Sequence, residues 1–99
     1  MQVVQLVLAN PLKDAIHASG FLATWLNQSD LTFVEQVEPN FEVLGEAIEA
    51  LPPTIANLNL MCYFRNRLQS SRKLVAGGEW GAAVYELREL HNKLARLVV

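Results

Sequence analysis

The chain has 99 residues and a net charge of −2; 52% of its residues are hydrophobic and only 18% are charged. A chain of this length has enough mass for one domain with a modest core. An average soluble domain has about 45 to 50% hydrophobic and about 25% charged residues, so this small domain is unusually apolar. We therefore expect part of its apolar surface to be covered by another chain.

Several classes of protein are excluded by simple counts. No apolar run approaches the roughly 18 residues that span a bilayer, so we expect no transmembrane helix and no membrane contact. The single cysteine, Cys62, excludes an internal disulfide and favours a reducing compartment. The apolar run Val3–Ala9 follows no positive residue and is short for a signal peptide. We expect a soluble, cytoplasmic protein.

The first segment, residues 2–9, is rich in branched aliphatic side chains. Five of its eight residues are of this kind: Val3, Val4, Leu6, Val7 and Leu8. Such residues favour a strand, but the chain offers no second convincing strand for pairing. We therefore expect a short helix or an ordered arm.

A helix is predicted near residues 11–27. Asn10 is a typical N-cap, and Pro11 suits the first helical turn. Gly20 inside this helix costs up to about 1 kcal/mol relative to alanine, so we expect close packing against another helix there. The apolar stripe of this helix comprises Leu12, Ile16, Ala23 and Leu26.

A second helix is predicted near residues 32–51. Thr32 and Glu35 have the spacing of a capping box. Because the helical spacing of apolar residues continues through Pro39, we favour one helix that kinks there. The alternative is two short helices with Asn40 as a second N-cap, since an interior proline disrupts a helix. The apolar positions are Val34, Val37, Phe41, Leu44, Ile48 and Leu51.

The opposite side of this second helix is acidic. Like charges repel one another and are relieved by opposite charge, so this acidic face is a candidate docking surface for a basic partner. The alternative is an ordinary solvated helix face. The acidic face comprises five glutamates with no basic residue among them: Glu35, Glu38, Glu42, Glu46 and Glu49.

The C-terminal half predicts an antiparallel hairpin of two helices, near residues 53–76 and 79–97. Pro52-Pro53-Thr54 marks the start of the first, and Gly77-Gly78 suits a left-handed cap at its end. Apolar side chains lie on several faces of this helix, so we expect it to be buried all round. The second helix has one apolar stripe: Ala83, Leu87, Leu90, Leu94 and Leu97.

The turn between these two helices resembles a known motif. Residues 78–84, with the sequence GEWGAAV, resemble the glycine, aromatic and alanine turn that opens the second helix of a tetratricopeptide hairpin. The match covers about a dozen residues, and no second copy lies about 34 residues upstream, where the period of that family would place it. The resemblance therefore describes the hairpin turn, and no function follows from it.

Charge is divided unevenly along the chain. Residues 1–52 hold seven acids and one base, whereas residues 53–99 hold three acids and seven bases. The basic half makes a nucleic-acid-associated regulator the alternative function. However, Arg65 and Arg72 flank one side of a helical stripe and Arg67 the other, so no single positive face is predicted.

The sequence does not favour catalysis, a metal site or a cofactor site. His17 and His91 are isolated; His17 follows Asp14 by one helical turn, as a surface pair does, and His91 borders an apolar stripe as a partly buried structural residue. Cys62 lies among apolar neighbours, so we expect a buried, inert thiol. Gly77-Gly78 follows no strand and has no lysine-serine continuation, so it is not a phosphate loop.

Together these patterns predict an all-α, four-helix bundle-like domain with a C-terminal antiparallel hairpin. The expected function is non-enzymatic binding of a protein, as an adaptor, chaperone, inhibitor or assembly factor. Because two-fold homodimers are the commonest soluble assemblies, we also expect a homodimer. Its interface is expected to include the aliphatic chain ends: Val3, Val4, Leu6, Val7, Leu8, Leu97, Val98 and Val99.

Overall fold

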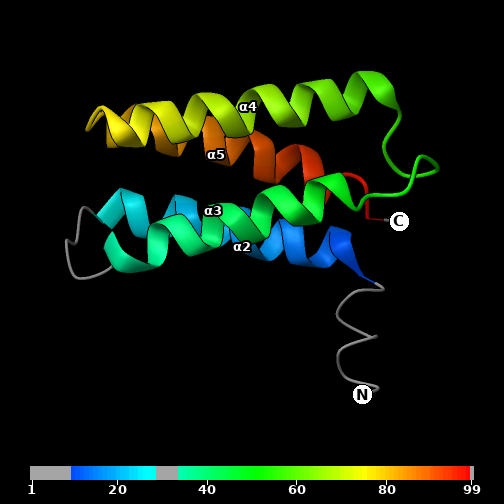
Figure 1. Ribbon diagram of the computed structural model, residues 1–99, viewed down its shortest axis with the longest axis horizontal. Helices are drawn as coiled ribbons and strands as arrows, with labels where there is room; N and C mark the ends of the chain where they lie inside the picture. Colours follow the sequence, from blue (N-terminus) through cyan, green and yellow to red (C-terminus); the bar gives the residue numbers. More distant parts are fainter. Residues whose placement is uncertain (1–9, 29–33, 99) are drawn as a thin grey trace, which may run out of the picture.

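The computed structural model describes residues 10–28 and 34–98 of the chain. These residues form four α-helices: α2 (Pro11–Gln28), α3 (Val34–Glu49), α4 (Leu58–Ala76) and α5 (Trp80–Ala95). The described part of the chain contains no strand. The predicted all-α fold with a C-terminal helical hairpin is confirmed (Figure 1). The aliphatic segment 2–9 and the capping residue Thr32 lie outside the described residues.

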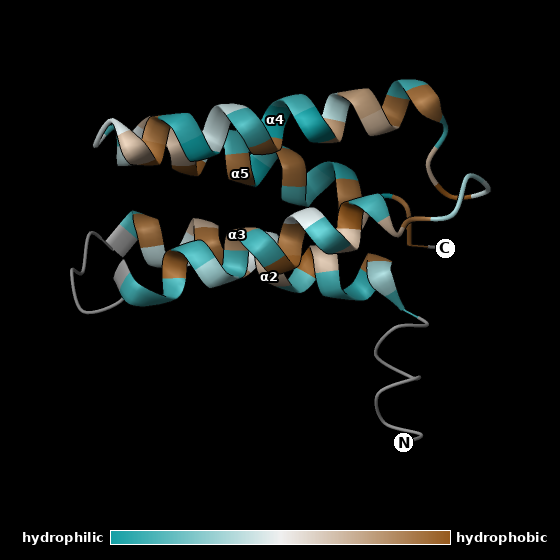
Figure 2. Cartoon of the chain, viewed as in Figure 1, coloured by the Kyte–Doolittle hydropathy of each residue, from teal (hydrophilic) through white to brown (hydrophobic). Residues whose placement is uncertain are grey.

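Successive helices run in opposite directions and close into a bundle (Figure 1). α2 packs against α3 and α5, and α4 packs against the same two helices. The packing between α3 and α4 is the least extensive of the four sides. Figure 2 shows hydrophilic and hydrophobic residues alternating along each helix, as expected where only one face of a helix is buried.

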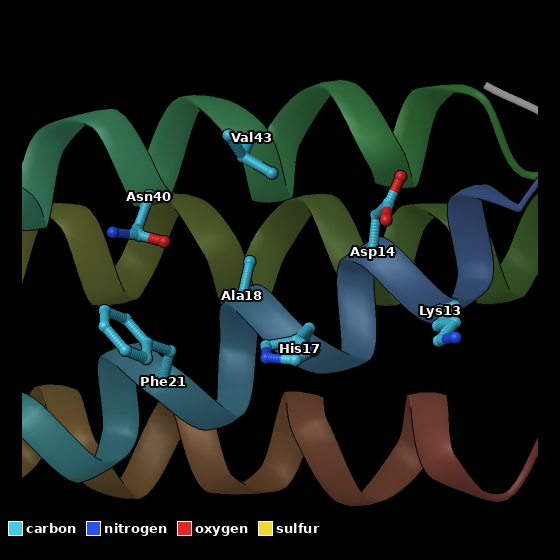
Figure 3. A pocket seen from close by; sticks show the side chains of 7 residues that line it. All are labelled: Lys13, Asp14, His17, Ala18, Phe21, Asn40 and Val43. Atoms are coloured by element: carbon cyan, nitrogen blue, oxygen red, sulfur yellow. The ribbon is translucent and has the colours of Figure 1, made fainter. Parts of the chain in front are cut away.

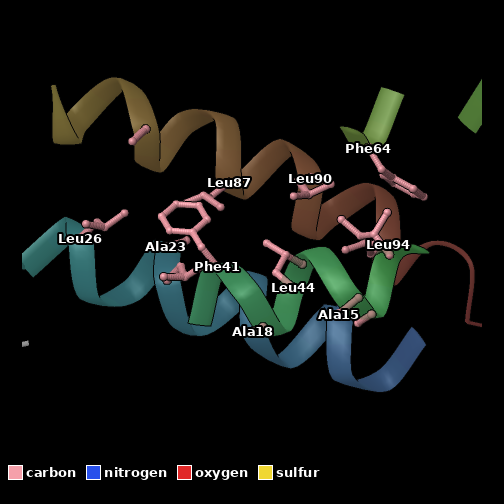
Figure 4. Packing of buried hydrophobic residues seen from close by; sticks show 14 of the residues in the cluster. Ala15, Ala18, Ala23, Leu26, Phe41, Leu44, Phe64, Leu87, Leu90 and Leu94 are labelled. Carbon is pink, nitrogen blue, oxygen red and sulfur yellow. The ribbon is translucent and has the colours of Figure 1, made fainter. Parts of the chain in front are cut away.

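The core lies between the four helices, and each of them contributes buried residues to it. Leu87 and Leu90 are completely buried, so the predicted stripe of this helix faces inward. Phe41 from α3 and Phe64 from α4 are the largest fully buried side chains (Figure 4). The buried residues of α5 are Ala83, Val84, Leu87, Leu90 and Leu94.

Helix α4 begins later than predicted. Residues 52–56 form turns instead, in which the Pro52 carbonyl accepts hydrogen bonds from the backbone N–H groups of Ile55 (2.9 Å) and Ala56 (3.0 Å). Asn57 is the N-cap, because its side chain accepts a hydrogen bond from the N–H of Leu60 at 2.9 Å. The prediction of a start at Pro53 is therefore wrong.

The prediction that this helix is buried all round is also wrong. Only one side of α4 is covered, because its packing is against α3 and α5. Its buried residues are Met61, Phe64 and Ser71. Leu58 is 75% exposed, and Cys62 is exposed rather than buried.

Helix α3 continues through Pro39, as the preserved apolar spacing predicted. A proline removes one backbone donor, so the loss is confined to one hydrogen bond near the start of the helix. Asn40 is an interior helical residue and not a second cap; its side-chain Nδ2 donates to the carbonyl of Gln36 at 2.7 Å.

The hairpin between α4 and α5 turns at the predicted glycine pair. Gly78 has a positive φ of 79°, which glycine adopts without steric cost. The N–H of Glu79 donates to the Leu74 carbonyl at 2.8 Å, and that of Gly78 to the Val75 carbonyl at 3.0 Å. This pair of hydrogen bonds is a Schellman motif, which satisfies carbonyls that the helix end leaves free.

Candidate interaction surfaces

An apolar hollow lies at the end of the bundle where α2 begins and the C-terminal tail follows α5. We call it the end pocket, and its volume is about 500 Å³. Figure 1 shows that the start of α2, the connection between α3 and α4 and the C-terminal tail gather at this end. The pocket is lined by Asn10, Leu12, Lys13, Ile16, His17, Ile55, Leu97 and Val98.

Local hydrogen bonds fix the three segments that form the end pocket. Asn10 caps α2, because its Oδ1 accepts from the N–H of Lys13 at 3.3 Å. The turn at Pro52 presents Ile55. After α5, the N–H groups of Leu97 and Val98 donate to carbonyls three residues earlier, at 3.0 and 3.3 Å, which extends the helical path.

The end pocket leaves aliphatic surface in contact with solvent. Val98 is 60% exposed and Ile55 is 36% exposed. Leu12, Ile16 and Leu97 are only partly buried and pack against the core from outside. The four helices therefore do not cover this end of the molecule.

Two of the residues predicted for a dimer interface, Leu97 and Val98, line the end pocket. The others, Val3, Val4, Leu6, Val7, Leu8 and Val99, lie outside the described residues. The sequence did not reveal the contribution of Ile55, because it had been assigned to a helix. The proline pair before it and the possible N-cap Asn57 after it were the available signals of a turn.

The acidic face lies partly against α4. Arg65 donates to both carboxylate oxygens of Glu49, from Nε and Nη2, at 2.7 Å each. This hydrogen bonding holds the pKa of the Glu49 carboxyl below its ordinary value. Arg72 forms an ion pair with Glu38 through Nη2 and Oε1, and its guanidinium also lies 5.6 Å from the centre of the Phe41 ring. Two of the five glutamates are therefore neutralised within the chain.

The other three members of the acidic face, Glu35, Glu42 and Glu46, are exposed. Within residues 10–28 and 34–98, none of them has an ion-pair partner. They form the outer part of the acidic face, away from α4.

The basic half of the chain is largely engaged with its own side chains. Arg65 and Arg72 are paired with glutamates of α3. Arg67 donates to Glu86 at 2.8 Å. The Lys93 ammonium lies 5.7 Å from the centre of the Tyr63 ring. Bases that are paired with carboxylates are less available to phosphates.

A groove between α2 and α3 holds a smaller hollow of about 320 Å³ (Figure 3). Figure 3 shows Asp14 directed toward α3 and His17 one helical turn further along α2, and both side chains line the groove. The groove is lined by Lys13, Asp14, His17, Ala18, Phe21, Asn40 and Val43.

His91 from α5 makes two hydrogen-bond contacts with α2. Its Nδ1 lies 3.0 Å from the Ile16 carbonyl and 3.1 Å from Ser19 Oγ. A carbonyl only accepts hydrogen bonds, so Nδ1 carries the proton and donates to Ile16. The Ser19 hydroxyl is completely buried and also donates to the Ile16 carbonyl, at 3.1 Å. Since Nδ1 cannot act as a base toward this serine, the contact joins two helices and does not form a nucleophile.

Gly20 makes the close approach of α2 and α5 possible. A Cβ at this position would lie 3.1 Å from Cε1 and 3.3 Å from Nδ1 of His91. The close packing predicted at Gly20 is therefore confirmed, with the histidine ring as the neighbour.

Residues 10–28 and 34–98 bring no group of three or more His, Cys, Asp or Glu together for a metal ion. None of the helices in this part of the chain has the length and apolar character needed to cross a membrane.

The described residues thus define a small helical bundle with an uncovered apolar end and a negatively charged outer face on α3. No protein-family model, no curated protein and no solved structure matches this chain.

Proposed function

We propose that this chain is a non-enzymatic protein–protein interaction domain, of the adaptor, chaperone, inhibitor or assembly-factor type, that self-associates as a dimer. The end pocket carries the proposal. It gathers five aliphatic side chains from three segments: Leu12, Ile16, Ile55, Leu97 and Val98. Two of them, Ile55 and Val98, are substantially exposed. Exposed aliphatic side chains that adjoin one another in a pocket support an interaction site there.

The outer part of the acidic face is proposed as a second contact, for a basic protein partner. Glu42 and Glu46 lie one turn apart, exposed and without ion-pair partners among the described residues. Replacing both with glutamine is expected to weaken binding of such a partner in affinity capture, because their charges attract it. Glu38→Gln, which removes a charge already paired with Arg72, is the matched control. Equal capture by the double variant and wild type would reject the acidic docking surface.

The nucleic-acid alternative has less support in the described residues. Arg65, Arg67 and Arg72 are each paired with a glutamate. Phosphate binding would have to displace these carboxylates or use the remaining bases, which include Lys73, Arg88 and Arg96. The protein-interaction proposal therefore takes precedence.

Sedimentation equilibrium at micromolar concentration tests self-association. Wild type is expected to sediment as a dimer of 22.2 kDa, twice the 11.1 kDa chain. Val98→Asp places a charge in the end pocket and is expected to give monomers, because burying an unpaired charge in an interface is costly. Val43→Asp, at an aliphatic residue of α3 that is 47% exposed and does not line the end pocket, should leave the dimer intact. A wild-type species of 11.1 kDa would reject the proposal.

A further inference from the structure

We infer that the end pocket of one copy receives the N-terminal arm, residues 2–9, of a second copy, so that two chains exchange arms reciprocally. This inference rests on the proposed self-association and names the segment that performs it. The pocket belongs to the described residues, and the arm is the segment of the same chain that immediately precedes Asn10, the first of them.

The chemistry of the arm matches that of the pocket. The arm contains five branched aliphatic residues, two glutamines and one alanine, with no charge. The lining offers five aliphatic side chains, with Asn10, Lys13 and His17 as its polar members. Aliphatic side chains of the arm would cover the exposed parts of Ile55 and Val98. Its glutamines can form hydrogen bonds with the polar lining.

The position and length of the arm allow the exchange. Asn10 is both the last residue before the helix and a member of the lining, so each arm starts at the edge of a pocket. Eight extended residues span at most about 29 Å. The α2 residues that line the pocket, from Asn10 to His17, cover about 10 Å of helix axis. An arm can therefore cross to a neighbouring copy and still lie along its pocket.

Local geometry at Asn10 and Pro11 disfavours occupation of the pocket by the arm of the same chain. The pocket extends along the first two turns of α2, so the arm would have to reverse direction directly before Pro11. A residue that precedes proline is restricted to extended conformations, and Asn10 is also held as the helix cap. A reciprocal exchange avoids this reversal. It also gives both copies the same contact, as two-fold symmetry requires.

A complementation experiment with full-length variants tests the exchange. One variant carries Leu6→Asp and Val7→Asp, because adjacent residues lie on opposite faces of an extended segment and one of them must face the pocket. The other carries Val98→Asp in the pocket. Each variant alone is expected to be monomeric, and circular dichroism should show that its helicity is retained. Gln5→Asp, which adds one negative charge at a polar arm position, should remain dimeric.

Mixing the two monomeric variants separates the possible arrangements. In an exchanged dimer the intact arm of the Val98→Asp chain fits the intact pocket of the arm variant, so native mass spectrometry should show a heterodimer and no homodimer of either variant. A mixture that stays monomeric, or an arm variant that dimerises alone, would overturn the exchange. A dimeric wild type would still support self-association in both cases. A monomeric wild type would reject both proposals.

Discussion

At the scale of single residues, Gly20 and His91 show how one contact sets the distance between two helices. The absence of a side chain at Gly20 lets the His91 ring lie against the α2 backbone. There its Nδ1 reaches the Ile16 carbonyl at 3.0 Å. The sequence predicted close packing at Gly20, because an interior helical glycine carries a cost that packing can offset. It did not identify His91 as the partner, because that contact joins residues more than 70 positions apart.

Gly20→Ala is expected to lower the free energy of unfolding by about 1 to 2 kcal/mol, because the overpacking penalty exceeds the gain in helix propensity. The histidine ring would have to move away from its hydrogen bond. Gly81 in α5 is the matched control, since a Cβ there meets nothing within 4 Å. Gly81→Ala should raise stability by about 0.4 to 1 kcal/mol. Urea denaturation measures both changes.

A double mutant distinguishes the contact with His91 from a general intolerance of Gly20. In a His91→Ala background the ring is absent, so Gly20→Ala should no longer destabilise the protein. Contacting residues show such coupling, whereas distant ones add independently. The same loss of stability in both backgrounds would mean that the His91 ring is not what requires glycine.

At the scale of the elements, the sequence predicted helices α2, α3 and α5 within a few residues, since capping residues and apolar spacing agree there. It failed at α4 for a physical reason. Pro52-Pro53 resembles a helix start, but here Pro52 organises a turn, and the cap is Asn57. Because Leu58 and Cys62 are apolar but lie outside the main apolar stripe of α4, the sequence indicated a helix buried on every side. In the structure both residues are exposed. Apolar residues on several faces of a helix indicate burial only if other helices cover those faces. The sequence does not show how many helices pack against a given helix.

The candidate surfaces were predicted unevenly for a similar reason. The acidic face was predictable from the spacing of the glutamates along one helix. Its division into a paired inner part and a free outer part depends on how α4 lies beside α3, which local spacing does not specify. For the same reason the sequence suggested that chain ends are uncovered but not that Leu97 and Val98 meet Ile55 in one pocket.

The side of the bundle between α3 and α4 has the least extensive packing and two ion pairs. The Arg65 hydrogen bonds lower the pKa of Glu49, so the folded state binds this proton more weakly than the unfolded state. The resulting stabilisation is present above the unfolded carboxyl pKa of about 4.3 and is lost as the pH falls through the lower folded pKa. Because both side chains are about half exposed, the contribution is small and is screened by salt.

Glu49→Gln is therefore expected to be slightly less stable than wild type at pH 7, with the difference shrinking as the pH falls below the unfolded carboxyl pKa of about 4.3 and absent below the lower folded pKa. Glu42→Gln, which removes an unpaired charge from the same helix, should show no such loss at pH 7. Thermal melts of the three proteins between neutral and acidic pH measure the effect. A Glu49→Gln deficit that persists at low pH would point to a cause other than the ion pair with Arg65.

At the scale of the whole molecule, the apolar composition and the uncovered end pocket both favour association with a second copy. A small chain with 52% hydrophobic residues can complete its burial by using a second copy. Folding and association are then linked, because the partner binds the folded chain and not the unfolded one. The stability of such a protein depends on its concentration, whereas that of a two-state monomer does not.

The melting temperature of wild type is expected to rise with protein concentration. Each tenfold increase adds about 1.4 kcal/mol per dimer, and the unfolding entropy of two chains of this length converts this into about 3 °C. Differential scanning calorimetry over roughly 1 to 100 μM measures the slope. Val43→Asp should keep this slope, whereas Val98→Asp should melt at one temperature throughout, because its end pocket no longer binds a partner. A wild-type melting temperature independent of concentration would mean that the folded chain is stable without a second copy.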